Sequence, residues 1–528
     1  MSTKVFGIDL GTTYSAIAYI NDQDAAEIVN NFEGNATTPS AIFFEGADNV
    51  VVGDEAKRGA LADPDNSCLL IKREMGTDYS IEYQGNSYNP ESLSALILRA
   101  LVEAANTELG EEISKAVITV PAYFGTQERE ATRQAGSIAG LEVAAIVTEP
   151  VAAALSIGVS SEKPETIMVY DLGGGTFDTT VMRVEPGKVE VVGVDGNRTL
   201  GGADWDEAMI GLLLEKFQEA AGEAADGCEF DEEFMLDLRL KAEETKKSLT
   251  RRQALNVRLA WQGHSEQVEI TREAFESATS HLVDQTVEIA ERTVAQAKEK
   301  HPGLEIDRVL LVGGSSRMPM IPEALKSKLG WDPVNTDFDL AVAKGAAIYG
   351  QAKVDEVLSD SDEELPDAPS RERKYFLGGA SSLSVSNVLA RSLGIKFTDE
   401  DTNESYISFF AHANDAIPFD PEPIRAQSIS EGQTRINLSL YEQAGEQESE
   451  EVSDNRLLKE VDLPFERPMP KYSPVDIVIT ISSEGLVRLK AEDPESGNTV
   501  ELEATVSQLS EAEVDAATSQ VSALSLRS

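Results

Sequence analysis

Two segments of the chain repeat one unusual pattern, with their aspartates 162 residues apart at Asp9 and Asp171. The first segment is Phe6–Thr13, FGIDLGTT, and the second is Val169–Thr176, VYDLGGGT. Each is an apolar run that ends in Asp-Leu-Gly and continues into small residues, which is typical of a buried strand followed by a tight turn. A unit repeated at a domain-sized interval indicates an internal duplication. We therefore expect two related lobes, each presenting one turn to a shared ligand.

The residues of the two turns predict a phosphate site. Glycines let the backbone approach a ligand closely and point successive amide groups at an anion, and Thr12, Thr13 and Thr176 add hydroxyl donors. The aspartates at the strand ends would repel phosphate unless a divalent cation lay between them. Asp9 and Asp171 therefore indicate Mg²⁺, held largely through water. The alternative is that the turns are two ordinary glycine-rich hairpins.

A third glycine turn, Gly313–Arg317, follows the apolar run Val309–Val312. An adenosine could lie against its flat Gly-Gly surface with the guanidinium of Arg317 stacked over the base. The alternative is a plain strand-to-helix turn. The chain contains no G-x-x-x-x-G-K-[ST] motif, which excludes the P-loop class of nucleotide-binding protein.

The pattern of apolar residues changes along the chain. Over roughly the first 355 residues, apolar runs such as Val117–Val120 alternate with helical patterns such as Ser92–Glu108, which indicates an α/β domain with a buried sheet. Beyond about residue 391, strand-like alternation replaces helical periodicity and predicts a separate β-sandwich. Ser510 and Glu513 predict a capping box at the start of one short helix.

The charge of the chain limits its partners. Lys plus Arg number 45 and Asp plus Glu number 93, for a formal net charge of −48, so we expect no nucleic acid and no membrane surface as partners. No run approaches the roughly 20 apolar residues of a membrane span, and no secretory signal is expected at the start. Cys68 and Cys228 are too few for a disulfide framework and favour a reducing cytosol, and no zinc spacing is present.

Seven motifs give the chain a specific resemblance. They are, in order, IDLGTTYS (Ile8–Ser15), IKREMG (Ile71–Gly76), ITVPAYF (Ile118–Phe124), TEPVAAAL (Thr148–Leu155), VYDLGGGTFD (Val169–Asp178), LGGADWD (Leu200–Asp206) and LVGGSSRMP (Leu311–Pro319). In these motifs the chain resembles the 70-kDa heat-shock, or DnaK-type, chaperone family. The resemblance implies an α/β actin-like (ribonuclease-H-like, duplicated) ATPase domain over residues 1–357 and an acidic linker over 358–390. It also implies an all-β sandwich that binds peptide over 391–508 and a short helix or tail over 509–528.

The resemblance also implies roles for individual residues. Lys72, Glu149, Asp171 and Thr176 match catalytic groups, and the lysine would neutralise γ-phosphate charge and help to place the attacking water. Asp9, Asp171 and Asp178 match a magnesium shell. The nucleotide contacts match Gly11, Thr12, Thr13, Tyr14, Gly173, Gly174, Gly175, Gly201, Gly202, Glu243, Lys246, Lys247, Thr250, Gly313, Gly314, Ser315, Arg317 and Asp339.

Two of these assignments have plain alternatives. Glu243, Lys246, Lys247 and Thr250 share one side of a helix, where ordinary surface charge pairs would also be found. Pro121 and Arg129 match the family's relay between the nucleotide site and the second domain, but they could equally be a strand-end proline and a surface arginine.

Several positions depart from the family pattern. Serines stand within Leu383–Asn387, where the family's linker has leucines. The serines remove apolar area that would be buried on docking, and each Å² lost costs about 25 cal/mol of docking free energy. The substitution of leucines by serines therefore predicts weak coupling between the domains. Ala145 replaces an arginine that engages J-domain partners, and Ala203 replaces an acidic residue of the nucleotide site. The hairpin between Thr250 and Thr271 is short and resembles the family branches that lack an extended exchange-factor contact, which implies fast intrinsic ADP release. The roughly 20 residues after the sandwich are too few for the family's helical lid, so bound peptide should dissociate quickly.

The expected function is that of an ATP-dependent cytoplasmic chaperone of the stress response, which hydrolyses ATP with Mg²⁺ and binds extended apolar segments of client proteins. Candidate peptide-groove residues are Ile395, Phe397, Ile429, Ile436 and Leu438, with plain sandwich core as the alternative. Whether J-domain co-chaperones or exchange factors act on the chain stays open. One rival is a nucleotide-gated regulatory or interaction module that holds no client. Another, a small-molecule kinase on the same fold, is disfavoured because no sugar pocket is predicted.

Overall fold

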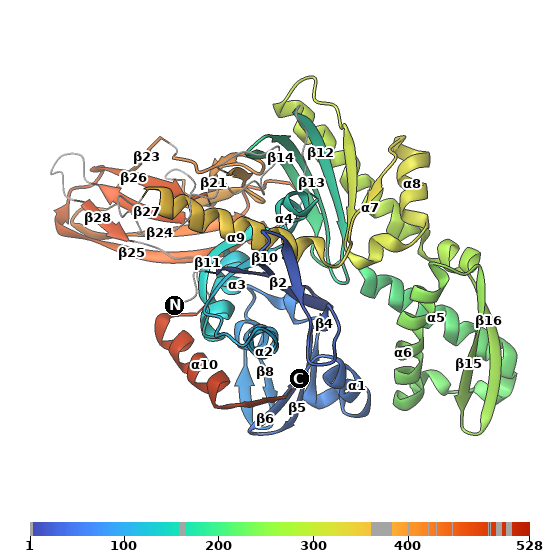
Figure 1. The fold of residues 1–528 in the computed structure, drawn as a ribbon. Coiled ribbons are helices and arrows are strands. Elements are labelled where there is room, and N and C mark those ends of the chain that lie inside the picture. The colour runs from blue at the N-terminus through green and yellow to red at the C-terminus, as the bar shows by residue number, and fades with distance from the viewer. Residues whose placement is uncertain are drawn as a thin grey trace.

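The molecule consists of two lobes, each built on a mixed sheet, and a separate all-β unit (Figure 1). The computed structural model describes residues 4–157, 164–360, 383–399, 402, 404–420, 422–428, 430–445, 447–483, 485, 487–492, 499–502 and 509–527. Most of the expected acidic linker, residues 361–382, and the groove candidate Ile429 lie outside these ranges. Among the described residues, no helix is long and apolar enough to cross a membrane.

The central sheets of the two lobes have the same strand order and the same strand directions. The first lobe has the order β3-β2-β1-β10-β11 and the second has β14-β13-β12-β17-β18, each with an antiparallel three-stranded ribbon followed by two parallel strands. The bounds are β1 (Phe6–Asp9), β2 (Tyr14–Ile20), β3 (Ala26–Val29), β10 (Lys115–Val120), β11 (Glu142–Thr148), β12 (Glu165–Leu172), β13 (Phe177–Glu185), β14 (Lys188–Asn197), β17 (Arg308–Val312) and β18 (Val334–Asn335). The internal duplication predicted from the repeated motif is confirmed.

The two lobes meet through a pair of helices, α4 (Glu149–Ser156) and α9 (Ala341–Asp360), which each follow the last strand of one sheet. Their backbones approach so closely that a Cβ added to Gly345 would lie 1.7 Å from the carbonyl oxygen of Ala152. Only glycine permits this contact, which fixes the two sheets beside one another. The strand-end residues Asp9 and Asp171 therefore lie at one interlobe junction, which we call the cleft.

Further strands and helices complete each lobe. The first lobe adds β4 (Thr38–Pro39), β5 (Ala41–Gly46), β6 (Asn49–Val52), α1 (Asp54–Ala62), β7 (Ser67–Leu69), β8 (Ile81–Tyr83), β9 (Asn86–Tyr88), α2 (Pro90–Leu109) and α3 (Thr126–Ile138). The second adds α5 (Gly202–Ala221), α6 (Glu232–Leu249), β15 (Ala254–Trp261), β16 (His264–Thr271), α7 (Arg272–Lys300) and α8 (Met320–Leu329). The β15–β16 hairpin closes through Gln262 and Gly263, which both have positive φ, as a two-residue turn requires.

The β-domain, residues 389–502, is a pair of four-stranded antiparallel sheets around one apolar core. One sheet has the order β21-β20-β24-β25 and the other β23-β26-β27-β28. The bounds are β20 (Leu393–Thr398), β21 (Ser405–Ala411), β23 (Ile424–Gln427), β24 (Gln433–Gln443), β25 (Asn455–Met469), β26 (Pro474–Ile481), β27 (Val487–Glu492) and β28 (Thr499–Leu502). The all-β sandwich expected after the α/β domain is present.

The segment before the β-domain is a strand of the second lobe's sheet. Strand β19 (Ser384–Val388) pairs in parallel with β14 through Ser384, Val385 and Ser386, and antiparallel with β22 (Ala416–Ile417). The sequence led us to expect weak docking here because serines replace leucines. Backbone pairing does not depend on those side chains. The remaining apolar residues of the segment also pack, since Val388 is buried in the core shared by the lobes and Leu383 and Val385 lie against it. The strength of the coupling between domains stays a prediction.

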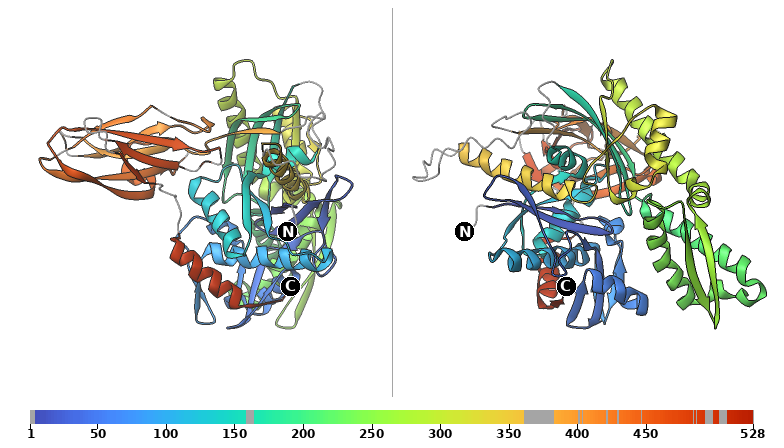
Figure 2. Two further views of the ribbon diagram at one scale, coloured as in Figure 1. Left: turned by 60° about the vertical axis from the view of Figure 1, so that its left-hand side comes forward. Right: turned by 45° about the vertical axis from the view of Figure 1, so that its right-hand side comes forward.

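The C-terminal segment returns to the first lobe, an arrangement that the sequence analysis did not anticipate (Figures 1 and 2). Helix α10 (Glu511–Ala523) begins with the predicted capping box of Ser510 and Glu513. After it, β29 (Ser525–Arg527) pairs in parallel with β6. Val521 is buried in the apolar core of the first lobe, and Arg99 of α2 donates a hydrogen bond to its carbonyl oxygen.

Candidate functional site

The two repeated glycine turns lie in direct contact across the cleft. A Cβ added to Gly174 would lie 2.1 Å from Oγ1 of Thr13, and one added to Gly175 would lie 2.3 Å from Cγ2 of Thr12. Gly11 is equally confined, since its Cβ would lie 2.0 Å from the carbonyl oxygen of Tyr14. Glycine is therefore required wherever one turn approaches the other. The structure brings together the two turns that the sequence assigns to one ligand.

The third glycine turn completes this cluster from the second lobe. Gly313 has φ of +80°, a conformation that favours glycine, and a Cβ there would lie 2.5 Å from Oδ1 of Asp171. The amide of Gly202, at the start of α5, donates to the carbonyl oxygen of Gly173 at 2.9 Å. A Cβ at Gly202 would lie 2.3 Å from Oγ of Ser315. Gly201 packs in the same way on the backbone of Gly175, and Gly314 lies beside Asp339.

Four carboxylates surround a single lysine beneath the turns. Lys72 is buried, and its Nζ lies 2.5 Å from Oε1 of Glu149. Asp171 and Asp178 are a cross-strand pair of β12 and β13 and are both buried, whereas Asp9 at the end of β1 is partly exposed. Asp9 accepts a hydrogen bond from Thr119, and Asp178 accepts one from the amide of Tyr123.

The electrostatics of this cluster call for a further cation. Desolvation and then the charge of Glu149 raise the pKa of Asp9 to about 7 and the pKa of Asp178 to about 7. The same causes, together with Asp178, raise the pKa of Asp171 well above its usual value. One lysine does not offset the charge of these groups, and oxygen donors of this kind suit Mg²⁺. Among the described residues, no three acidic, histidine or cysteine side chains are placed to bind a metal ion directly. The donor set therefore fits a hydrated ion.

An ion-pair cluster bridges the two lobes beside Tyr14. Lys57 of α1 lies 2.6 Å from Glu243 of α6, and Lys247 lies 2.7 Å from the same carboxylate. Burial opposes the ionisation of Glu243, but the two lysines outweigh it and lower its pKa to about 2. Both ammonium groups lie 5.0 Å from the centroid of the Tyr14 ring, and both donate to its hydroxyl at 3.1 Å. Lys57 is far from Glu243 in sequence, and no motif pointed to it.

The remaining nucleotide candidates lie along the second lobe's side of the cleft. Arg317 forms an ion pair with Asp339, and its guanidinium lies 4.6 Å from the ring centroid of Phe338. Lys246 donates to the carbonyl oxygen of Gly202 at 2.9 Å. Thr250 ends α6 and donates to the carbonyl oxygen of Lys247.

A further arginine, Arg73, joins the two lobes at the glycine turns. It was not identified from the sequence as a site residue. Nε of Arg73 donates to the carbonyl oxygen of Gly175 at 3.0 Å, and its Nη2 pairs with Asp204 at 3.1 Å. Asp204 in turn accepts the amide of Gly201 at 2.8 Å. The position directly after Lys72 in the motif IKREMG was the only signal that could have found it.

The groove candidates of the β-domain lie in its interior. Ile395, Ile436 and Leu438 are buried in the apolar core, and Phe397 is partly buried against it. Burial of this kind favours the alternative of plain sandwich core, and the groove assignment stays a prediction. Arg129 donates to the carbonyl oxygens of Phe124 and Ala122, which holds the turn between β10 and α3. Its role as a relay also stays a prediction.

Comparisons with known proteins agree with this architecture. The family model described as Hsp70 protein matches residues 5–83 and 79–525. The chain is 36% identical over 507 residues to the "Chaperone protein DnaK" of Halobacterium salinarum, and the match covers 94% of this chain and 74% of that relative. The chain therefore belongs to the Hsp70 family of ATP-dependent chaperones, whose members are ATPases.

Proposed function

We propose that this chain binds ATP with Mg²⁺ between its two lobes and hydrolyses the γ-phosphate there to power a chaperone cycle. The observation that carries the proposal is the meeting of three glycine turns, from both halves of a duplication, above one lysine and four carboxylates. Backbone amides and the hydroxyls of Thr12, Thr13 and Thr176 bind the phosphates. Bound Mg²⁺ supplies charge neutralisation at the phosphates, and Asp9, Asp171 and Asp178 would hold it through water.

Lys72 and Glu149 are the residues that act on the reacting atoms. The ion pair between them holds the ammonium group inside the carboxylate cluster, beneath the phosphate turns. An ammonium at this point stabilises the charge of the transferring phosphoryl group. When the lysine turns to phosphate, Glu149 is free to accept a hydrogen bond from the attacking water and so to orient it.

The adenosine lies on the other side of the phosphate turns in this proposal. Arg317 presents a flat guanidinium face, which stacks well on a base. Glu243 is ionised and offers acceptors for ribose hydroxyls, with Lys247 and Thr250 beside it on α6. In this proposal Lys57 has to part from Glu243 for nucleotide to enter or leave, because their ion pair joins α1 of the first lobe to α6 of the second.

The β-domain binds client segments in this proposal, and nucleotide state reaches it through two contacts. One is the pairing of β19 with β14, and the other is Glu442, whose carboxylate accepts the amide of Thr126 at the start of α3. A second candidate function is a nucleotide-gated interaction module that holds no client. The burial of Ile395, Ile436 and Leu438 favours this rival, because an apolar groove needs accessible side chains.

Fluorescence anisotropy with a labelled, unstructured apolar peptide separates the two functions. The chaperone predicts saturable binding that weakens when ATP replaces ADP. The variant Lys72→Ala should keep the ATP-dependent weakening while losing hydrolysis, and Lys216→Ala, at an exposed lysine of α5, is the control. No peptide binding in either nucleotide would contradict the chaperone and favour the module.

A further inference from the structure

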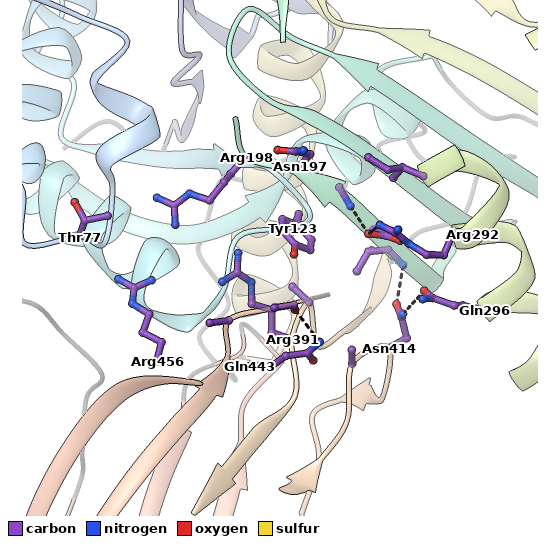
Figure 3. Close-up of a pocket in the computed structure, with 18 of the residues that line it drawn as sticks. Thr77, Tyr123, Asn197, Arg198, Arg292, Gln296, Arg391, Asn414, Gln443 and Arg456 are labelled. Atoms are coloured by element: carbon purple, nitrogen blue, oxygen red, sulfur yellow. Dashed lines mark hydrogen bonds and ion pairs between the residues drawn. The ribbon is translucent and has the colours of Figure 1, made fainter. Parts of the chain in front are cut away.

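A cavity of about 730 Å³ lies where both lobes meet the β-domain, away from the glycine turns (Figure 3). Thr77 and Tyr123 line it from the first lobe, Arg198 from the second, and Arg391, Gln443 and Arg456 from the β-domain and the segment leading into it. None of the three glycine turns contributes to its walls. The volume lies within the range of small-molecule sites.

The walls of this cavity are basic in an otherwise strongly acidic molecule. Four arginines line it against two aspartates, in a chain whose net charge is −48. Arg292 already has an acidic partner, because it donates two hydrogen bonds to the carboxylate of Asp195, at 2.6 and 3.1 Å. The side chains of Arg198, Arg391 and Arg456 extend into the cavity from different elements (Figure 3).

These three arginines are paired incompletely with acids. Arg198 and Arg456 share a single oxygen of Glu128, at 3.4 and 2.8 Å, and each also donates one hydrogen bond to a backbone carbonyl of the first lobe, that of Arg73 and that of Gly76 respectively. Arg391 lies against the ring of Tyr123, with 4.7 Å from its guanidinium to the ring centroid, and its nearest carboxylate is Glu442 at 3.8 Å. The side chain of Arg391 is only 9% exposed. Its Nε has no hydrogen-bond partner within the part of the chain that the structure describes.

A buried guanidinium with an unused donor is poorly satisfied, and an anion in the cavity would satisfy it. Guanidinium groups bind phosphate oxygens through two parallel hydrogen bonds, which makes arginine the residue best suited to such an anion. We propose that the cavity binds a small oxyanion of the phosphate type, held by Arg198, Arg391 and Arg456. This site goes beyond the proposed function, because it is separate from the ATP cleft and does not depend on hydrolysis.

The three arginines come from different parts of the molecule, so an anion bound to all of them would hold those parts together. Arg198 follows β14 of the second lobe, Arg391 lies between β19 and β20, and Arg456 belongs to β25. Glu128, which two of them share, belongs to α3 of the first lobe. An anion between these groups joins both lobes to the β-domain and stabilises the docked arrangement over any arrangement in which the domains separate.

Calorimetric titration of the full chain with inorganic phosphate tests the proposal at constant ionic strength, with the cleft saturated first by MgADP and then by a non-hydrolysable MgATP analogue. We expect saturable binding of phosphate or pyrophosphate at a ratio of one per chain. The double variant Arg391→Gln with Arg456→Gln should weaken binding at least tenfold. The matched control Arg425→Gln removes an exposed arginine of the β-domain that pairs with Asp476 and should leave binding unchanged.

A second variant keeps the test decisive if the double variant undocks the β-domain. Arg198→Lys retains the charge but loses the bidentate fork, so it should weaken phosphate binding severalfold while small-angle scattering still reports the docked shape. A separate titration with ADP distinguishes the sources of the anion. A second equivalent that the double variant loses would identify a nucleotide phosphate, and a single equivalent would identify free phosphate. Absence of saturable binding, equal binding in all variants, or an equal response to chloride would overturn the proposal.

Discussion

Substitution of one glycine at the nucleotide site tests how closely the glycine turns must pack. In Gly202→Ala, the new Cβ would lie 2.3 Å from Oγ of Ser315 and 3.2 Å from Nζ of Lys246. Both partners also belong to the nucleotide candidates, and Lys246 already donates to the carbonyl oxygen of residue 202. Overpacking at a tight contact typically costs about 1–3 kcal/mol. If that strain is borne by the nucleotide-binding conformation, MgADP should bind about 5- to 150-fold more weakly.

The same helix provides the control. Gly211 also lies in α5, is exposed, and has no atom within 4 Å of an added Cβ. Gly211→Ala should therefore stabilise the helix by up to about 1 kcal/mol and leave nucleotide binding unchanged. Removing the clash with Ser315→Ala in the Gly202→Ala background should restore part of the affinity. Calorimetric titration with MgADP measures all three. Equal affinity in Gly202→Ala and Gly211→Ala would refute the argument that Gly202 is needed for close packing.

The other parts of the structure give three further predictions. Val521→Ser should lower the melting temperature, because it places a hydroxyl in the core of the first lobe at a cost of about 1–3 kcal/mol. The control Ala516→Ser, on the exposed side of α10, should leave the melting temperature unchanged. Equal melting temperatures in the two variants would contradict the packing of α10. Lys57→Ala should speed ADP release about fivefold for each kcal/mol that the ion pair between Lys57 and Glu243 contributes to holding the nucleotide. Stopped-flow fluorescence measures the release rate, and an unchanged rate would show that the ion pair does not retain nucleotide. In nucleotide-free protein, Asp9 and Asp178 have pKa values of about 7 against an ordinary 3.8, so the folded state holds protons more tightly. The unfolding free energy of the protein should therefore fall as pH rises from about 4 to about 7. MgADP should make this fall smaller. A free energy of unfolding that rises over the same pH interval in urea titrations would contradict the raised pKa values.

The fold was predictable where a local pattern carried long-range information. The repeated Asp-Leu-Gly turns at Asp9 and Asp171 identified the duplication, since each pattern fixes a strand and its turn without reference to the rest of the chain. The capping box at Ser510 and Glu513 is likewise a local signal, and the helix begins where it predicts. Sequence spacing alone also placed Glu243 and Lys247 on one side of a helix.

What the sequence did not predict depends on contacts between distant segments. Lys57 reaches Glu243 only because α1 and α6 face one another across the cleft, and nothing near Lys57 in sequence signals this. The return of β29 to β6 rests on backbone pairing, which side-chain patterns do not encode strongly. The same reason explains the linker, where Ser384 and Ser386 pair with β14 through their backbones while Val385 and Val388 supply apolar packing.

Lys72, the lysine within the carboxylate cluster, acts on the γ-phosphate in the proposed function. Single-turnover hydrolysis of ATP with Mg²⁺ tests it in Lys72→Ala, with nucleotide affinity measured on the same preparation. The account predicts a loss of hydrolysis of about 10²- to 10³-fold, as for other removed electrostatic groups, while ATP still binds. Hydrolysis at the rate of the unsubstituted protein in Lys72→Ala would contradict the account.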